Sequence, residues 1–316
     1  MSNVEMTQAQ THDVPRTNGV AKLASISHTP RSRTPPAICY TLRRKVNAFL
    51  NTHPETKLLR DTQAQVRLAM GIIDEALQRY GREEFSLAYN GGKDCLVLLV
   101  LILACLPGLA PTPPFTSSPA PSGPADTTTA DELETSEAQQ QPQKTNPNPE
   151  PTEDEEPPQP LQAIYIAPPD PFPEVEAFVA TSTKQYHLDL VRYSLPMRRA
   201  LEAYLGDRPA VRAIFMGTRR TDPHSEFLRA FSPTDADWPQ FMRVNPLLDW
   251  HYAEIWTFIR QLDLSFCCLY EQGFSSLGGM TNTRPNPALA LDTDAKTFRP
   301  AYELVRDDEE RLGRDR

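Results

Sequence analysis

A chain of 316 residues, 39% of them hydrophobic, can fill the core of one large domain or of two small ones. Its net charge of −9 leaves no basic excess of the kind that nonspecific binding to a nucleic-acid backbone needs, so we expect no nucleic-acid partner. The longest apolar run, residues 95–106, is too short for the roughly 20 residues of a membrane span. We therefore expect a buried helix there and no membrane partner.

The N-terminus and the cysteines bear on the cellular compartment. Residues 1–38 lack the apolar core of a secretory signal, and we interpret them as a disordered N-terminal tail. The five cysteines are an odd number and form no CxxC pair, which argues against a disulfide framework and against a zinc site. These features predict a protein of the cytoplasm.

The first predicted elements are a helix, a strand, a glycine turn and a second helix. Apolar residues within 57–80 recur at spacings of four, three and four, which indicates one buried helical face, and Gly81 supplies a C-terminal stop. Residues 84–89 are apolar and β-prone, which predicts a strand. The glycine turn 90–94 follows, and residues 95–106 are long enough for a helix.

After residue 160 the predicted strands and helices alternate. In chain order they are strand 161–167, helix 173–186, strand 188–193, helix 196–205 and strand 211–217. Such alternation is typical of βαβ units, so we predict an α/β fold with a mostly parallel sheet flanked by helices. A last helix is predicted at 251–262, with Asp249 as its N-cap.

Residues 107–160 differ from the rest of the chain in composition. They hold 14 of the 32 prolines, and ten acidic residues against the single base Lys144. A segment of this composition cannot bury enough apolar surface to fold, so we interpret it as a disordered insert. It would split one domain that is formed by residues 39–106 and 161–316.

The most informative motif is the segment Ser86-Leu-Ala-Tyr-Asn-Gly-Gly-Lys-Asp-Cys95, which begins in a predicted strand and ends at a predicted helix. Its two glycines let backbone N–H groups approach a ligand closely, and the positive end of the helix points at the same place, which favours a phosphate. Lys93 adds a positive charge for phosphate oxygens, and Asp94 adds a carboxylate suited to Mg²⁺. The Walker pattern GxxxxGK[ST] does not fit, because the glycines are adjacent and a cysteine ends the loop.

Two further motifs also follow predicted strands. Asp170-Pro-Phe-Pro-Glu-Val-Glu-Ala-Phe-Val179 opens a helix, and its acidic residues suit a helix N-terminus with or without a function. Gly217-Thr-Arg-Arg-Thr-Asp-Pro223 stands at the carboxyl end of a strand, where open α/β sheets bind ligands. Its arginines and aspartate indicate either a solvated loop or a site for an anion and a polar ring.

These motifs resemble those of a known family. The order Asn-Gly-Gly-Lys-Asp-Cys is similar to the pyrophosphatase-type loop of enzymes that split ATP between its α and β phosphorus atoms. The segment 170–179 resembles an element of the PAPS reductase and FAD synthase superfamily. Residues 217–223, followed by 237–250, look like eukaryotic, fungal-type FAD synthase rather than its reductase relatives. The likeness continues through the segments 273–278, 283–289, 299–304 and 310–314.

The resemblance implies a PAPS reductase-like (adenine nucleotide alpha hydrolase-like) fold. It also implies that the FMN phosphate attacks the α-phosphorus of ATP to give FAD and pyrophosphate, with Mg²⁺ as the cofactor. We expect a monomer whose partners are the small molecules ATP and FMN.

Site residues follow from the same resemblance. The ATP-binding set is Tyr89, Asn90, Gly91, Gly92, Lys93, Asp94 and Ile164. The flavin-binding set is Arg219, Arg220, Asp222, Trp238, Arg311 and Arg314. The catalytic set is Asn90, Asp94, Asp222, Arg311 and Arg314, and Asp94 is the predicted metal ligand.

Three other functions are compatible with parts of this pattern. A PAPS reductase would need a redox cysteine near its C-terminus, and none follows Cys268. Another ATP pyrophosphatase-type enzyme, such as a tRNA-modifying thiolase or an adenylating ligase, would need CxxC cysteines or a basic RNA-binding face. A nucleotide or flavin sensor would keep the pocket without turnover, and the intact motif residues argue against it.

Overall fold

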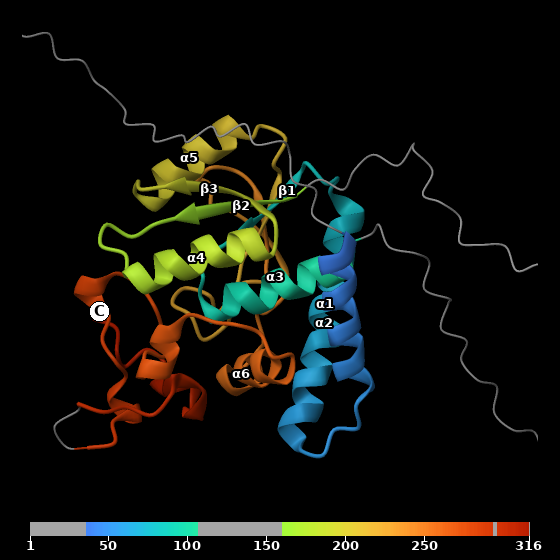
Figure 1. The fold of residues 1–316 in the computed structure, drawn as a ribbon. Coiled ribbons are helices and arrows are strands. Elements are labelled where there is room, and N and C mark those ends of the chain that lie inside the picture. The colour runs from blue at the N-terminus through green and yellow to red at the C-terminus, as the bar shows by residue number, and fades with distance from the viewer. Residues whose placement is uncertain (1–35, 107–159, 293–295, 316) are drawn as a thin grey trace, which may run out of the picture. The chain divides into compact units, whose positions relative to one another are not determined.

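The N-terminal part of the fold is a pair of helices that leads into the sheet. The computed structural model describes residues 36–106, 160–292 and 296–315, which lie within one compact unit, Arg33–Arg316. Helix α1 (Pro36–Asn51) and helix α2 (Lys57–Arg79) lie side by side (Figure 1). Thr56 caps α2, its hydroxyl oxygen accepting a hydrogen bond from the N–H of Leu59 at 3.2 Å.

A six-stranded sheet forms the centre of the molecule, with the order β3-β2-β1-β4-β6-β5. Its strands are β1 (Phe85–Ala88), β2 (Leu161–Ile166), β3 (Leu188–Tyr193), β4 (Ala213–Phe215), β5 (Phe231–Pro233) and β6 (Met242–Val244). All neighbouring strands are parallel except β5 and β6, which are antiparallel. This arrangement confirms the predicted mostly parallel α/β sheet.

Four further helices complete the fold: α3 (Lys93–Cys105), α4 (Pro173–Gln185), α5 (Met197–Asp207) and α6 (Tyr252–Gln261). Figure 1 shows α5 on one side of β2 and β3, with α3 and α4 on the other. Successive residues of a strand point to opposite faces, so Ala163 joins the large core around α3 while Ile164 joins a smaller cluster under α5. Short 3₁₀ turns make up much of the chain after residue 267.

Helix α3 is apolar on every side, and its residues Leu96 to Ala104 are all buried. A helix with no polar face must be enclosed, and α3 packs against α1, α2 and α6 as well as lying beneath the sheet. This confirms the predicted buried helix, although α3 begins two residues earlier than expected. None of the described helices is long and apolar enough to cross a membrane.

Several boundaries differ from the predictions. The predicted tail 1–38 ends too late, because α1 begins at Pro36 and residues 36–38 belong to it. Residues 1–35 and 107–159 lie outside the described residues, so the tail and the insert stay predictions. Asp249 is not the N-cap of α6; that position is His251, and Asp249 instead accepts a hydrogen bond from Arg220 Nε at 2.6 Å. Strands β5 and β6 were not predicted, because three residues are too few to show a period. Helix α1, 16 residues long, was also not predicted.

Arg43 of α1 closes the carboxyl end of α3, which predicts a stability effect for its removal. Its Nε donates to the carbonyl of Ala104 and its Nη2 to that of Leu106, both at 2.7 Å. Arg43→Ala leaves these two carbonyls without their partner and should lower the free energy of unfolding by about 1–3 kcal/mol. Urea unfolding followed by circular dichroism measures the change.

The matched control is Arg44→Ala, because the exposed Arg44 guanidinium only faces the Tyr40 ring, 5.7 Å from its centroid. We expect Arg44→Ala to change the free energy of unfolding by less than about 0.5 kcal/mol. Equal losses in the two variants would contradict the capping role of Arg43.

Candidate functional site

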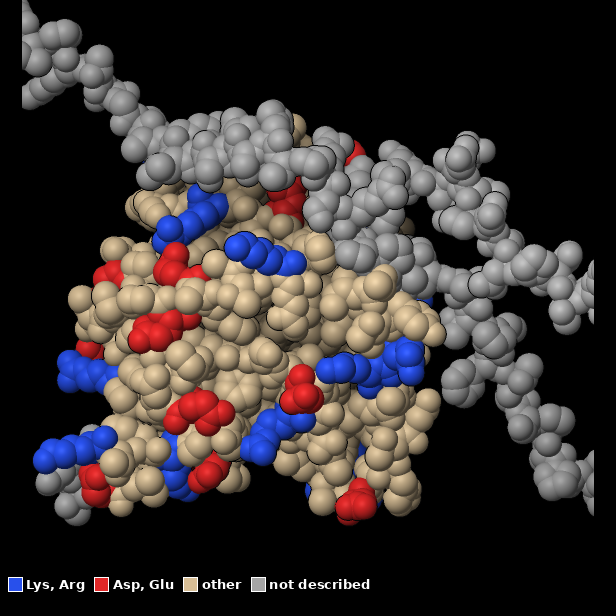
Figure 2. All heavy atoms as spheres, viewed as in Figure 1, with Lys and Arg blue, Asp and Glu red and all other residues tan. Residues whose placement is uncertain are grey.

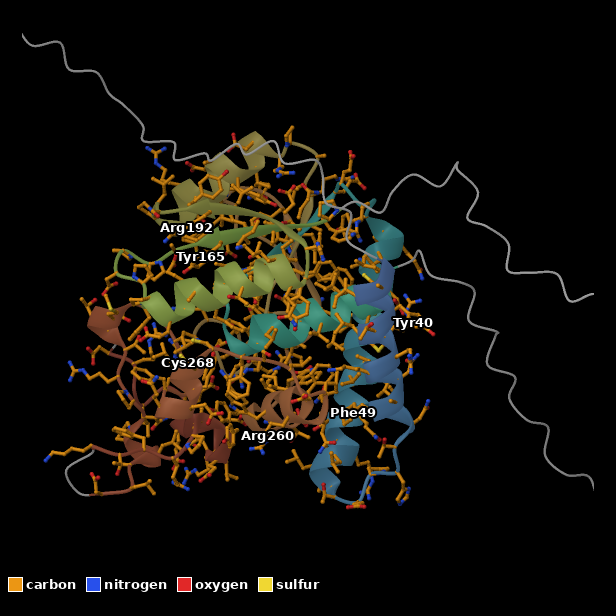
Figure 3. All side chains as sticks on the ribbon, in the orientation of Figure 1. Tyr40, Phe49, Tyr165, Arg192, Arg260 and Cys268 are labelled. Carbon is orange, nitrogen blue, oxygen red and sulfur yellow. The ribbon has the colours of Figure 1, made fainter. Side chains whose placement is uncertain are left out.

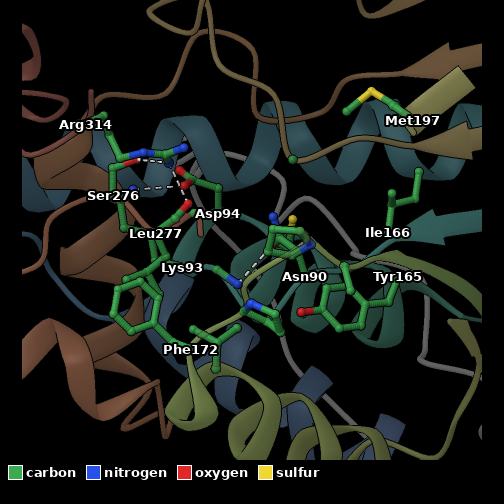
Figure 4. A pocket seen from close by; sticks show the side chains of 18 of the residues that line it. Asn90, Lys93, Asp94, Tyr165, Ile166, Phe172, Met197, Ser276, Leu277 and Arg314 are labelled. Atoms are coloured by element: carbon green, nitrogen blue, oxygen red, sulfur yellow. Dashed lines mark hydrogen bonds and ion pairs between the residues drawn. The ribbon is translucent and has the colours of Figure 1, made fainter. Parts of the chain in front are cut away.

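A cavity of about 700 Å³ opens where the parallel strands end (Figure 4). The carboxyl ends of β1, β2, β3 and β4 meet at one edge of the sheet, which is where open α/β sheets bind ligands. The loops after these strands line the cavity, together with residues 276–278 and the C-terminal segment, which we define as residues 307–315. The volume lies within the range that small-molecule sites occupy.

The glycine loop, residues 90–94, joins β1 to α3 at the floor of this cavity. Gly91 has φ +73°, and a Cβ there would overlap the side chain of Val179, so the position requires glycine. Asn90 Oδ1 accepts from the N–H of Gly92, and the N–H of Lys93 donates to Tyr270 Oη, both at 2.9 Å. The N–H groups in the rest of the first turn of α3 have no intrahelical acceptor and suit an anion.

Four charged side chains meet at the glycine loop. Lys93, Arg219 and Glu310 are buried, and Asp94 is 20% exposed and lines the cavity. Lys93 Nζ lies 2.5 Å from Glu310 Oε1 and 3.0 Å from Asp94 Oδ2. Arg219 Nε lies 2.7 Å from Asp94 Oδ1, and Arg219 Nη2 pairs with Glu310 Oε2. We call this group the charge cluster.

Three members of the charge cluster, Lys93, Asp94 and Arg219, have pKa values that their charged neighbours shift in favour of the ionised form. Burial alone lowers the pKa of Lys93 and of Arg219, but the carboxylates of Asp94 and Glu310 outweigh it, and both pKa values are raised. Burial raises the pKa of Asp94, but Lys93 and Arg219 lower it further, so the net shift is downward. The cluster therefore holds two cations and two anions.

Asp222 and two arginines of the C-terminal segment stand on one wall of the cavity. Asp222 Oδ2 accepts from the backbone N–H of Arg219 at 2.9 Å, and Asp222 Oδ1 lies 3.9 Å from Arg311 Nη1. Arg314 Nη1 donates to the carbonyl of Leu277 at 2.7 Å (Figure 4). Burial, followed by repulsion from Asp94, raises the pKa of Asp222.

The opposite wall combines an aromatic ring with a further arginine, and neither residue was predicted from a sequence motif. Arg192 of β3 lies 5.6 Å from the centroid of the Tyr165 ring on β2, and the two are neighbours in Figure 3. Glu176 joins them, accepting from Tyr165 Oη at 2.7 Å and pairing with Arg192 Nη2 at 3.1 Å. The register of β2 with β3, which pairs Tyr165 with Arg192, could have indicated this contact. The lining of the cavity also includes apolar side chains: Phe172, Leu195, Met197 and Leu277.

The structure brings most of the predicted site residues to one cavity. Those that line it are Asn90, Gly92, Lys93, Asp94, Asp222, Arg311 and Arg314. Their predicted contacts with ATP and flavin stay predictions. Lys93 differs from the expected mobile phosphate ligand, because its side chain is only 3% exposed and already pairs with two carboxylates.

The remaining predicted residues do not line the cavity. Tyr89 and Ile164 point into the core, and Tyr89 Oη donates to Ser182 Oγ. Arg219 is buried in the charge cluster, while Arg220 is exposed and pairs with Asp249. Trp238 packs against the small apolar cluster under α5, which lies on the face of the sheet opposite α3. Gly91 acts through its backbone conformation.

A divalent metal fits this site only if ATP brings most of its ligands. Among the described residues, no three His, Cys, Asp or Glu side chains gather as a metal site. Mg²⁺ is commonly held by one or two carboxylates together with substrate phosphates and water. Three carboxylates line the cavity, and both oxygens of Glu310 already pair with Lys93 and Arg219. Asp94 and Asp222 could serve in this way, although Asp94 already pairs with two cations.

Comparison with known proteins identifies relatives over most of the chain. The phosphoadenosine phosphosulfate reductase domain matches residues 191–285. A probable FAD synthase of Schizosaccharomyces pombe is 33% identical over 269 residues, which are 85% of each chain. The flavin adenine dinucleotide synthase of Saccharomyces cerevisiae is 30% identical over 277 residues, 85% of this chain and 80% of the relative.

The fold also matches solved structures. The FMN adenylyltransferase of Candida glabrata, in complex with FAD and inorganic pyrophosphate, superposes with a TM-score of 0.70 at 26% identity, over 89% of this chain and 99% of that one. Yeast FAD synthetase in complex with FAD gives the same TM-score at 25% identity. Because the sequence identity extends over at least 80% of both fungal relatives, this chain belongs to the FAD synthase family.

Proposed function

We propose that the protein transfers the adenylyl group of ATP to the phosphate of FMN, giving FAD and pyrophosphate. The strongest support from the geometry is that a single cavity contains the glycine loop on one side and Asp222, Arg311 and Arg314 on the other. A reaction that joins two phosphate-bearing substrates needs both anion-binding elements within reach of one another. The family relationship supports the same reaction.

The chemistry needs no covalent enzyme intermediate and no strong base. An oxygen of the FMN phosphate forms a bond to the α-phosphorus of ATP, and the bond from that phosphorus to the oxygen bridging to the β-phosphate breaks. Pyrophosphate leaves with the electron pair. The second pKa of a phosphate monoester is about 6, so the nucleophile is largely a dianion at neutral pH and carries no proton on the attacking oxygen. Positioning and charge neutralisation then remain as the tasks of the protein.

Residues around the cavity divide these tasks. The glycine loop and the first turn of α3 would hold the polyphosphate of ATP through backbone N–H groups. Arg311 and Arg314 would face the phosphate oxygens, because a planar guanidinium group can donate two hydrogen bonds to one phosphate. Asp222 would orient Arg311, from which it lies 3.9 Å away.

Mg²⁺ is part of this proposal. The charged residues that line the cavity are four cations and three anions, Lys93, Arg192, Arg311 and Arg314 against Asp94, Asp222 and Glu310. This balance is too small to neutralise two substrates that carry several negative charges. A divalent metal that enters with ATP would supply positive charge at the phosphates, with Asp94 or Asp222 as its protein ligand.

The cysteines give no support to the two competing functions that need a reactive thiol, a PAPS reductase and a sulfur-transferring ATP pyrophosphatase-type enzyme. All five cysteines are free thiols, and none lines the cavity except Cys95, whose thiol pKa is raised by burial to about 12. A redox or sulfur-transfer role would need a thiolate there. Free thiols also support the predicted location in the cytoplasm, a reducing compartment.

Steady-state assays with FMN, ATP and Mg²⁺, with FAD and pyrophosphate separated by HPLC, test the proposal. We expect FAD and pyrophosphate in equal amounts. Asp222→Ala and Arg311→Ala should each lower kcat/KM by about 100-fold or more, because each removes charge or orientation at the reacting phosphates. A sensor would bind both ligands and release no pyrophosphate.

Arg306→Ala is the control for these variants, because the Arg306 side chain is 66% exposed and pairs only with acidic neighbours along the chain. It should keep kcat/KM within about twofold of the wild-type value. Wild-type rates in Asp222→Ala or Arg311→Ala would refute the assignment of the site.

The ionised Asp222 should also lower the free energy of unfolding of the protein at neutral pH. A residue that costs stability in this way is typical of a functional site. Its pKa is raised above the ordinary value of 3.8, so the folded protein holds the proton more tightly than the unfolded chain. Ionisation therefore costs stability, and the cost is absent below pH 3.8 and complete above the raised pKa. Asp222→Asn removes the charge and keeps an oxygen for the N–H of Arg219.

We expect Asp222→Asn to raise the free energy of unfolding at pH 8 by about 0.5–2 kcal/mol while activity falls. The gain should shrink as the pH decreases toward 4. Urea unfolding at a series of pH values measures it, and a loss of stability that is the same at every pH would contradict the buried, destabilising charge.

A further inference from the structure

We propose that Glu310 is a positioning residue that fixes the C-terminal segment to the glycine loop, and that Lys93 acts on the reaction through Glu310 and not as a ligand of the phosphates. This inference rests on the proposed function, because it concerns how the two arginines of that segment reach the site. Neither Glu310 nor this role for Lys93 follows from the glycine-loop motif, which predicts a phosphate-binding lysine.

The contacts of Glu310 use both oxygens of its carboxylate. Oε1 lies 2.5 Å from Lys93 Nζ, and Oε2 pairs with Arg219 Nη2. The side chains of Lys93, Arg219 and Glu310 are 3%, 1% and 7% exposed. Glu310 thus connects two cations that come from different parts of the fold, the start of α3 and the loop after β4.

Lys93 has little freedom to turn toward a substrate. Two of its three N–H donors are directed at carboxylates, Glu310 and Asp94, and its Nζ lies 5.1 Å from the centroid of the Tyr252 ring. Moving the ammonium to a phosphate would leave the buried Glu310 with one of its two cations, and a buried charge that loses a partner is strongly unfavourable. Lys93 therefore remains in the charge cluster when the phosphates bind.

The described residues of the C-terminal segment form no regular helix or strand, but they contain one 3₁₀ turn, Asp307–Glu309, and an isolated antiparallel bridge that pairs Arg314 with Thr283. Its backbone is held by side chains of other segments: Asn286 Nδ2 donates to the carbonyl of Glu309 at 2.7 Å, and Ser275 Oγ donates to that of Glu310 at 2.6 Å. Among the described residues of this segment, Glu310 is the only one that is buried. This buried carboxylate holds the part of the segment next to Arg311 against the glycine loop. Arg314 is also held by the backbone bonds on either side of it, from Arg284 N–H to the carbonyl of Gly313 and from Asp315 N–H to that of Asn282.

Close packing makes the position of Arg314 sensitive to any shift of the segment. Its guanidinium lies against Gly278, where a Cβ would overlap it, and it donates to the carbonyl of Leu277. A segment that leaves the charge cluster would withdraw this guanidinium and that of Arg311 from the cavity wall. We call the fraction of molecules whose C-terminal segment lies against the charge cluster the docked fraction. Only these molecules would bind both substrates, so the apparent Kd would equal the intrinsic Kd divided by the docked fraction.

The first test compares Glu310→Gln with Glu309→Gln, whose side chain is 31% exposed and contacts only Arg306 at 3.7 Å. If the docked fraction falls to a tenth, KM for FMN and ATP rises about tenfold while kcat recovers at saturating substrate. A residue that touched the reacting phosphates would lower kcat instead. Unchanged KM values in Glu310→Gln would overturn the proposal.

Limited trypsin digestion gives a readout that does not require activity. Cleavage after Arg311 removes residues 312–316, a loss that intact mass spectrometry detects. We expect faster loss of this peptide from Glu310→Gln than from the wild type or Glu309→Gln, and FMN with ATP should slow it. Equal cleavage rates in all three proteins would overturn the docking role of Glu310.

A double-mutant cycle tests the role of Lys93. Lys93→Met and Glu310→Gln each leave the charge cluster unbalanced, whereas the double variant retains one cation and one anion, Arg219 and Asp94. If Lys93 acts through Glu310, the double variant loses no more kcat/KM than the worse single variant. Effects that multiply would overturn this part of the proposal, because they would indicate independent contacts with substrate.

These outcomes are separable from failure of the proposed function. Wild-type protein that makes no FAD would refute the function, whereas wild-type protein that makes FAD with Glu310→Gln unaltered would refute only the present inference. Should Glu310→Gln not fold, the neutral double variant still allows the digestion and KM measurements. Faster cleavage and higher KM in that variant would support the docking role, and wild-type values would overturn it.

Discussion

The charge cluster of two cations and two anions, Lys93, Asp94, Arg219 and Glu310, joins three parts of the chain that are far apart in the sequence. It ties the start of α3 to the loop after β4 and to the C-terminal segment. Buried ion pairs often contribute little net stability, because desolvation offsets their attraction, but removing a single partner is costly. The cluster therefore constrains how the three segments meet more than it stabilises the fold. The cavity exists in its present form because those segments meet there.

This constraint separates the charges that hold the site from the charges that face the substrates. Lys93 and Arg219 are neutralised inside the cluster, so the accessible positive charge comes from the first turn of α3 and from Arg192, Arg311 and Arg314. Such an arrangement suits adenylyl transfer, in which the substrates supply both the nucleophile and the leaving group and the protein supplies orientation. On the face shown in Figure 2, acidic and basic side chains are interspersed over the described residues, with no continuous basic patch. This pattern agrees with small-molecule substrates.

Local patterns predicted most of the fold, and about half of the predicted site residues line one cavity. The alternation of strands and helices and the apolar run of α3 each reflect a short-range rule, and both predictions are confirmed. The adjacent Gly91 and Gly92 form the expected turn between β1 and α3, while their contact with ATP stays a prediction. The features that local patterns did not predict depend on distant contacts. Lys93 and Glu310 are 217 residues apart, so no local pattern could indicate that the lysine is buried. Glu310 was missed because it is one of four consecutive acidic residues and the other three are at least partly exposed. Trp238 and Arg220 follow family motifs, yet the turn after β4 and the return to β6 direct them away from the cavity.

A crystal structure of the protein with FMN and a non-hydrolysable ATP analogue would test the central claim most directly. The account predicts that the triphosphate lies against the backbone of the glycine loop, that Arg311 and Arg314 face the phosphates, and that Lys93 Nζ keeps its contact with Glu310. A Lys93 side chain that has left Glu310 to bind a phosphate oxygen would contradict it. So would a C-terminal segment that lies away from both substrates.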